Sequence, residues 1–97
     1  MRPSDARVIS RILDDFLADN PELALRLARN RAISAWGDLL GDAISGCTGG
    51  LYVRNRTLYA KITSSVVRSE LILCREQLVR RLNEKAGREV IDDIVFR

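Results

Sequence analysis

The sequence predicts an α+β fold whose helices and strands follow the order α-α-β-β-α-β. In three stretches, apolar residues recur at the spacing of one helical face. In two short stretches near the middle of the chain they alternate with polar residues, as in a half-buried hairpin. The last residues are rich in β-branched side chains. The length of 97 residues suits one domain, residues 1–97, with a thin core.

The first helix is predicted over residues 5–18, with Ser4 as its N-cap. Pro21 disfavours helical geometry at Asn20 and therefore ends this helix. The predicted apolar face consists of Val8, Ile12, Leu13 and Phe16.

The second helix is predicted over residues 21–45, with Asn20 as its cap. Gly37 and Gly41 are expected to bend or break it. Trp36, the only tryptophan, falls among apolar residues of this helix. We predict that its ring lies in the core, which removes about 200 Å² of surface from water.

A hairpin is predicted from strands near residues 50–55 and 57–63, with a turn near Asn55-Arg56. Side chains alternate between the two faces of a strand. One face is therefore apolar, and the opposite face carries Tyr52, Arg54, Tyr59 and Lys61. A third strand is predicted over residues 90–96.

The longest helix is predicted over residues 66–86, capped by Ser64 or Ser65 and ended by Gly87. The three strands are expected to pack as one sheet against it. Both cysteines, Cys47 and Cys74, are expected to be free thiols in a reducing compartment. Cys74 is expected in the core, on the apolar stripe Val67, Leu71, Cys74, Leu78 and Leu82.

The sequence lacks the residues that several types of enzymatic reaction require. It contains no histidine, which excludes Ser-His-Asp and Cys-His catalysis and argues against a zinc site. The pairs Asp14-Asp15 and Asp92-Asp93 are adjacent, so their side chains diverge. No P-loop and no apolar run of about 20 residues occurs. We therefore expect a cytoplasmic binding protein that is not an enzyme, without a cofactor, metal or membrane segment.

The charge distribution favours a phosphate-rich partner for the second half of the chain. The net charge is +3, and 14 of the 16 basic residues are arginine. Residues 49–97 carry ten basic and six acidic groups, whereas residues 1–48 carry six and seven. The alternative is an ordinary solvated surface, because an excess of this size is far below that of a dedicated nucleic-acid arm.

The hairpin provides the candidate nucleic-acid site. Aromatic and cationic side chains together stack bases and hold phosphates. The candidates are Tyr52, Arg54, Arg56, Tyr59 and Lys61. The alternative is that water or another protein element covers this face.

The longest helix provides a candidate docking strip for a protein partner. Arg68 and Arg75 are seven residues apart and would share one side, with Ile72 and Val79 beside them. The alternative is that the arginine stems cover the margin of the core. The segment 46–49 matches Gly-x-x-Gly, but a backbone clamp of KH domains lies between two helices and usually contains a basic residue, so we interpret it as a helix-ending turn.

The sequence resembles the DciA family of bacterial replicative-helicase loaders, well over roughly residues 33–97 and loosely over the first helix. No single motif is decisive, and the ordered set carries the resemblance. The set comprises Trp36 followed by Gly41, the hairpin segments 51–55 and 58–62, Ser64-Ser65, Arg68, Glu70-Leu71, Arg75, Leu78, Leu82-Asn83, Gly87 and the closing segment 90–97.

The resemblance implies a KH-like fold, similar to the N-terminal domain of DnaA, in which the sheet packs on the long third helix. It implies a DNA-replication accessory module that delivers or holds the DnaB-type helicase without ATPase activity, with single-stranded DNA as a further expected partner. The chain resembles the short branch of the family without a C-terminal tail, and it has Val67 where members often carry an aromatic residue. Two alternatives stay open: an RNA-binding KH-like protein of ribosome or RNA metabolism, and a structural dimerisation module. The oligomeric state is left open.

Overall fold

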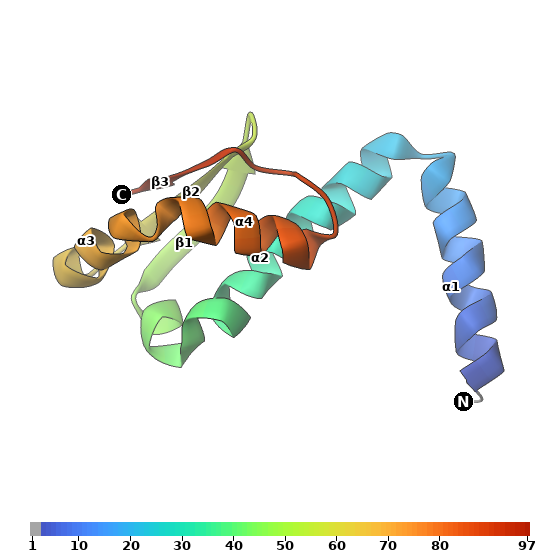
Figure 1. Cartoon of the computed structure of the whole chain (residues 1–97), viewed down its shortest axis with the longest axis horizontal. Helices are drawn as coiled ribbons and strands as arrows, with labels where there is room; N and C mark the ends of the chain where they lie inside the picture. The colour runs from blue at the N-terminus through green and yellow to red at the C-terminus, as the bar shows by residue number, and fades with distance from the viewer. Residues whose placement is uncertain (1–2) are drawn as a thin grey trace.

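The computed structural model describes residues 3–97, with the side chains of Val8, Ile9 and residues 11–97. Helices α2 and α4 pack against each other on one face of a three-stranded sheet, and α1 stands apart from this body (Figure 1). The predicted α+β class is therefore confirmed. In chain order the elements are α1 (Pro3–Ala18), α2 (Pro21–Gly46), β1 (Thr48–Arg54), β2 (Thr57–Ile62), α3 (Ser65–Leu73), α4 (Arg75–Ala86) and β3 (Asp93–Phe96).

The boundary between α1 and α2 lies where Asn20 and Pro21 predict it, but Asn20 does not cap α2 with its side chain. Its Nδ2 instead donates to the carbonyl of Phe16 at 2.7 Å and so satisfies the last turn of α1. Ser4 lies inside α1 rather than before it, because the helix begins at Pro3. The Ser4 side chain lies outside the described residues.

The predicted bend in α2 occurs at Gly41. This residue has φ +83° and ψ 174°, a backbone conformation that side-chain-bearing residues rarely adopt. Beyond the bend, the last turn folds back along the helix, and Ser45 Oγ lies 3.1 Å from the position that a Cβ on Gly37 would occupy. The two glycines thus act together, one at the bend and one at the close approach.

The sheet has the order β1-β2-β3, with β2 antiparallel to β1 and parallel to β3. Asn55 and Arg56 form the predicted two-residue turn with φ values of 50° and 61°, as in a type I′ hairpin. The third strand is shorter than predicted and begins at Asp93. The preceding residues are bound to α4 instead, because the backbone N–H groups of Val90 and Ile91 both donate to Asn83 Oδ1.

The prediction of one continuous helix over residues 66–86 is wrong, because the chain bends at Cys74 into α3 and α4. The bend keeps both Leu71 and Leu78 buried, and it turns Cys74 out to solvent. The predicted core position of Cys74 is therefore also wrong. Ser64 caps α3, as predicted, by accepting from the N–H of Val67, and Gly87 ends α4 in the left-handed conformation.

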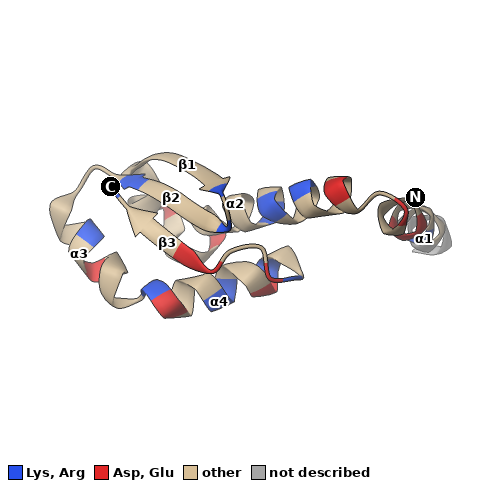
Figure 2. Ribbon diagram, turned by 90° about the horizontal axis from the view of Figure 1, so that it is seen from above, with Lys and Arg blue, Asp and Glu red and all other residues tan. Residues whose placement is uncertain are grey.

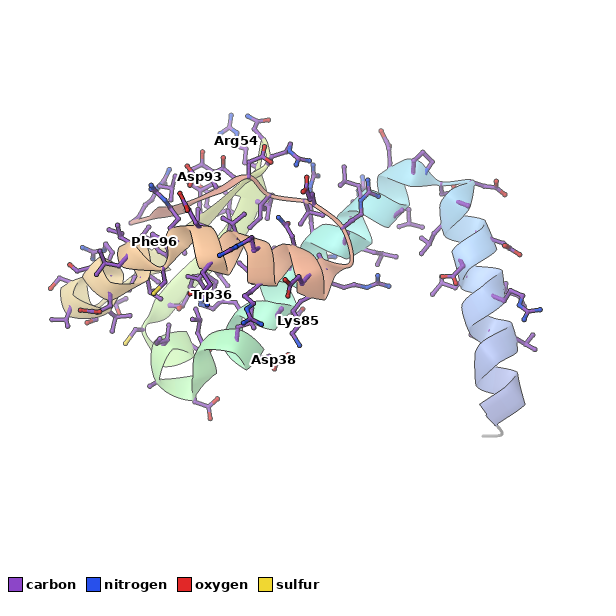
Figure 3. The ribbon with its side chains drawn as sticks, in the orientation of Figure 1. Trp36, Asp38, Arg54, Lys85, Asp93 and Phe96 are labelled. Carbon is purple, nitrogen blue, oxygen red and sulfur yellow. The ribbon has the colours of Figure 1, made fainter. Side chains whose placement is uncertain are left out.

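The core lies between the α2–α4 pair and the inner face of the sheet. Trp36 is at its centre, 2% exposed, which confirms its predicted role (Figure 3). Its Nε1 donates to Thr48 Oγ1 at 3.0 Å, and this hydroxyl donates to the carbonyl of Ile44. The largest fully buried side chains around it are Leu58, Ile62, Leu82, Val90, Ile91 and Ile94.

Candidate functional site

The outer face of the sheet is the face opposite α2 and α4, and no described helix covers it (Figure 2). Strand register decides which side chains it carries. Tyr52 pairs with Tyr59 across β1 and β2, whereas the neighbouring pair Val53 and Leu58 faces the core. The prediction that Tyr52, Arg54, Tyr59 and Lys61 share one face agrees with this register.

Two tyrosines and an arginine form a row across this face. The ring centroids of Tyr52 and Tyr59 are 4.9 Å apart with an interplanar angle of 12°, so the rings are stacked. The guanidinium carbon of Arg97 lies 4.9 Å from the centroid of Tyr59, within the range of a cation–π contact. We call Tyr52, Tyr59 and Arg97 the aromatic row.

The stacking limits how the aromatic row can meet a base. The two rings cover each other's facing sides, and Arg97 lies over the Tyr59 ring. Tyr52 is at the end of the row and is 47% exposed. A base therefore has access to the outer side of Tyr52, rather than to a flat platform spread over several strands.

Two cations flank the row. Arg54 and Lys61 are both exposed, and Arg54 lies near the hairpin tip, away from the helices (Figure 3). The Lys61 stem passes beside Gly49, where its Cδ would be 3.7 Å from an added Cβ. With Arg97 these residues give the outer face three cationic groups.

Arg97 was missed from the sequence as a site residue. Alternation along the third strand would have placed it on the side of Asp93 and Val95, but only the strand order shows that this side is next to Tyr59. The N–H of Arg97 donates to the carbonyl of Ala60, which extends the parallel pairing and fixes the position of the side chain.

Arg56 does not join the aromatic row. Its Nε and Nη2 bind the two carboxylate oxygens of Asp92 at 2.9 and 2.8 Å, and its Nη1 donates to the carbonyl of Glu89. The hydrogen bond to Arg56 lowers the pKa of Asp92, and the same bond raises the pKa of Arg56. The predicted phosphate-binding residue is thus engaged by a carboxylate at the hairpin turn.

The predicted docking strip is not formed as one strip, because it required Arg68 and Arg75 to share one side of a continuous helix. The bend at Cys74 places them on two different helices, α3 and α4. Arg68 is half-buried, and its Nη2 donates to the carbonyl of Ile62 at 2.8 Å. Arg75 is bound to Asp93 at 3.5 Å, at the other end of the strands. Ile72 is exposed, and Val79 is half-buried against the core.

A different apolar surface occurs on α3. Val66, Ile72 and Leu73 are 72%, 46% and 80% exposed, and we call them the α3 patch. Only Ile72 was predicted. Val66 and Leu73 are seven residues apart on the same helix, outside the stripe that faces the core, so this spacing was the available signal.

Comparison with known protein families gives one match. A model of the family described as "Dna[CI] antecedent, DciA" matches residues 8–96. The chain belongs to the DciA family. Searches of curated proteins and of solved structures found no match.

Membership of the DciA family gives the chain a role related to DNA replication, in the pathway of the replicative helicase, and implies a protein partner. It also confirms the family expected from the sequence. Among the described residues, no group of three or more Cys, Asp or Glu is placed to hold a metal ion. In that same part of the chain, every helix is too short or too polar to cross a membrane.

Proposed function

We propose that this DciA-family protein is a non-catalytic module that docks on a DnaB-type replicative helicase. The observation that carries the proposal is the family match, which extends over residues 8–96 and so includes every strand of the sheet. Asp92 and Asp93 are paired with Arg56 and Arg75, so these two adjacent carboxylates do not form an acid–base pair with each other.

The α3 patch supports protein docking as the main activity. Three large apolar side chains on one short helix are exposed to water, and such clusters typically mark protein-binding surfaces. The patch ends at Leu73, the last residue of α3, directly before the bend into α4, so its apolar side chains lie at a corner of the body. We infer that the helicase covers Val66, Ile72 and Leu73.

The outer face of the sheet supports a second, weaker contact with single-stranded DNA. Tyr52 offers one ring face to a base, and Arg54 and Lys61 share the face of the row that contains Arg97, so these cations can meet the flanking phosphates. Three cations predict few phosphate contacts, and therefore a shallow dependence of affinity on salt.

The position of the Gly-x-x-Gly segment argues against the RNA-binding alternative. It lies between α2 and β1, and its Thr48 hydroxyl is occupied by Trp36 and Ile44 inside the body. The tight junction between two helices, where a KH clamp lies, is at Cys74 and contains no glycine. The Gly-x-x-Gly segment therefore does not have the position of a KH clamp, and the α3–α4 junction lacks the glycines of one.

The experiment is a pair of titrations with matched surface variants. The wild type, the double variant Ile72→Asp/Leu73→Ser and the double variant Arg54→Ala/Lys61→Ala are each titrated with purified replicative helicase without DNA, and with single-stranded DNA. We expect the α3 variant to lose helicase affinity by roughly tenfold or more and to keep DNA binding. The sheet variant should behave in the opposite way.

Each variant serves as the control for the other, because both are exposed double substitutions on the same body. Circular dichroism melts check that neither unfolds. Helicase binding that is absent in the wild type, together with sequence-specific RNA binding, would favour the RNA-binding alternative. Equal loss of helicase affinity in both variants would place the docking surface elsewhere.

A further inference from the structure

Helix α1 presents an apolar stripe that the other described residues leave uncovered. The chain has a radius of gyration of 15.6 Å, compared with about 12.5 Å for a compact domain of this length, and α1 stands apart from the body (Figure 1). A single helix of 16 residues is marginal in water without a packing partner. The stripe consists of Val8, Ile9, Ile12, Leu13 and Phe16, each between 44% and 64% exposed.

The charges on one flank of this stripe suit a partner helix that runs in the opposite direction. At 3.6 residues per turn, Arg11 and Asp15 lie one turn apart along the same flank of the stripe. Asp15 is in the C-terminal half of the helix, and the last turn of the helix contains no basic residue. Acidic groups there oppose the helix dipole, so nearby positive charge from a partner would be stabilising.

We propose that α1 pairs with α1 of a second copy of this chain, in an antiparallel, two-fold-symmetric contact. In such a contact the same flank of each helix faces its counterpart, because the interface is isologous. If Leu13 lies at the axis, Arg11 of one copy is level with Asp15 of the other, and the reverse pair forms by symmetry. A parallel pair would instead set this flank against the opposite flank of the partner.

The size of the stripe fits a reversible association. Five side chains of this size and exposure offer on the order of 500 Å² of apolar surface per copy, so a pair buries about 1,000 Å², near the lower limit for specific interfaces. A second copy is the occupant we choose because it necessarily carries both the matching stripe and the complementary charges. The pairing does not depend on the proposed binding of a helicase.

The pairing would place two copies of the aromatic row and of the α3 patch in one particle. A target with repeated binding sites would then be held by two contacts at once, and the second contact forms at the effective concentration set by the first. The dimer would therefore bind a multimeric partner or a long DNA strand more tightly than the monomer does.

The first experiment is sedimentation equilibrium of the full chain over about 1 μM to 1 mM, a range that brackets weak dimers. We expect a monomer–dimer equilibrium that Ile12→Asp weakens roughly tenfold or more, since it places a charge in the apolar contact. The control Asp14→Ser lies on the opposite side of α1 and should leave the dissociation constant unchanged. A mass equal to one chain at every concentration would overturn the proposal.

Charge reversal tests the flank pairs. Arg11→Glu alone should weaken the dimer a few-fold, because it creates repulsion with Asp15 of the partner. The double variant Arg11→Glu/Asp15→Arg restores opposite charges and should recover the wild-type dissociation constant. A double variant that is weaker than the single one contradicts the pairing.

Cross-linking tests the direction. In a Cys47→Ala/Cys74→Ala background, chains with Ile9→Cys are mixed with chains with Phe16→Cys and oxidised. An antiparallel contact gives mainly mixed disulfide dimers, whereas a parallel one gives mainly like-with-like dimers and sinks the proposed geometry. If the chain stays monomeric and Ile12→Asp abolishes helicase binding instead, the stripe is a helicase site and the pairing is wrong.

Discussion

Helices α1 and α4 have the same kind of sequence pattern, but their apolar stripes differ in burial. Both are amphipathic, with large apolar side chains at helical spacing and charged residues on the other side. The stripe of α4 (Leu78, Leu82 and Ala86) is buried against α2 and the sheet. The stripe of α1 is exposed along its length.

The difference follows from how each helix is connected. The segment α3–α4 joins two parallel neighbouring strands, β2 and β3, and such a crossover must return across one face of the sheet. Asn83 then fixes α4 to the following segment through three hydrogen bonds with Val90 and Ile91. In the described structure, α1 is joined to the body only through α2, so nothing forces its stripe inward.

The largest expected effect comes from truncating the side chain at the centre of the core. Trp36→Ala should lower the free energy of unfolding by about 3–5 kcal/mol, because it leaves a cavity and removes the hydrogen bond that the Thr48 hydroxyl accepts. Circular dichroism melts measure the loss, since the variant has no tryptophan fluorescence. Trp36→Phe keeps most of the volume and should cost less. An unchanged midpoint for both variants would contradict the core position of the ring.

A matched pair of truncations tests the two helices directly. Leu82→Ala in α4 should cost about 2–5 kcal/mol. Ile12→Ala in α1 should change the stability of the body by less than about 0.5 kcal/mol, because its side chain is 64% exposed. Both are measured by Trp36 fluorescence in urea at low protein concentration. A similar loss from Ile12→Ala would show that α1 packs on the body.

Local patterns in the sequence predicted the body more completely than the surfaces. The period-2 alternation, the Asn55-Arg56 turn, the Ser64 cap and the Gly87 C-cap are local features, and each lies where predicted. The bend at Cys74 was missed because the stripe of α3 and α4 continues in helical register through it. The bend of α2 was predictable because Gly41 marks it, whereas no glycine or proline marks the bend at Cys74.

The candidate site depended on contacts that are distant in sequence. Tyr52 and Tyr59 were placed together because one hairpin joins them, and the register carries that information. Arg97 joins the row only through the parallel pairing of β3. Arg56 is held away from the row by its bond to Asp92, which is 36 residues further along the chain. Neither contact has a signature in the composition of the hairpin.

A smaller effect is expected on the salt dependence of DNA binding when cations are removed from the outer face of the sheet rather than from the helical face. Arg54→Ala/Lys61→Ala should reduce the slope of log affinity against log salt for single-stranded DNA by about one to two units. Arg80→Ala/Arg81→Ala, on α4, removes the same charge from the helical side and should change the slope little. Fluorescence anisotropy over a salt series measures both. Equal changes would indicate binding by net charge alone.

The smallest effect concerns the ion pair that ties the hairpin turn to the body. Asp92 has a lowered pKa in the folded state, so its stabilising contribution is present above the ordinary value of 3.8 and is lost as the pH falls through the folded value. The stability difference between wild type and Asp92→Asn should therefore be small at pH 7, and should vanish in strong acid and shrink at high salt. Urea titrations at several pH values measure it.

The same Asp92→Asn variant, which removes a stabilising ion pair, is expected to strengthen the contact with single-stranded DNA. Asp92→Asn frees the Arg56 guanidinium at the hairpin turn, so it should add up to one phosphate contact and steepen the salt slope by about 0.7. Glu89→Gln changes the net charge equally, but it keeps the backbone carbonyl that Arg56 contacts and the Asp92 pair, so its slope should stay at the wild-type value. If both variants steepen the slope alike, net charge rather than a freed Arg56 is responsible. If neither does, the hairpin turn lies outside the DNA contact, and the contact is confined to the aromatic row and its flanking cations.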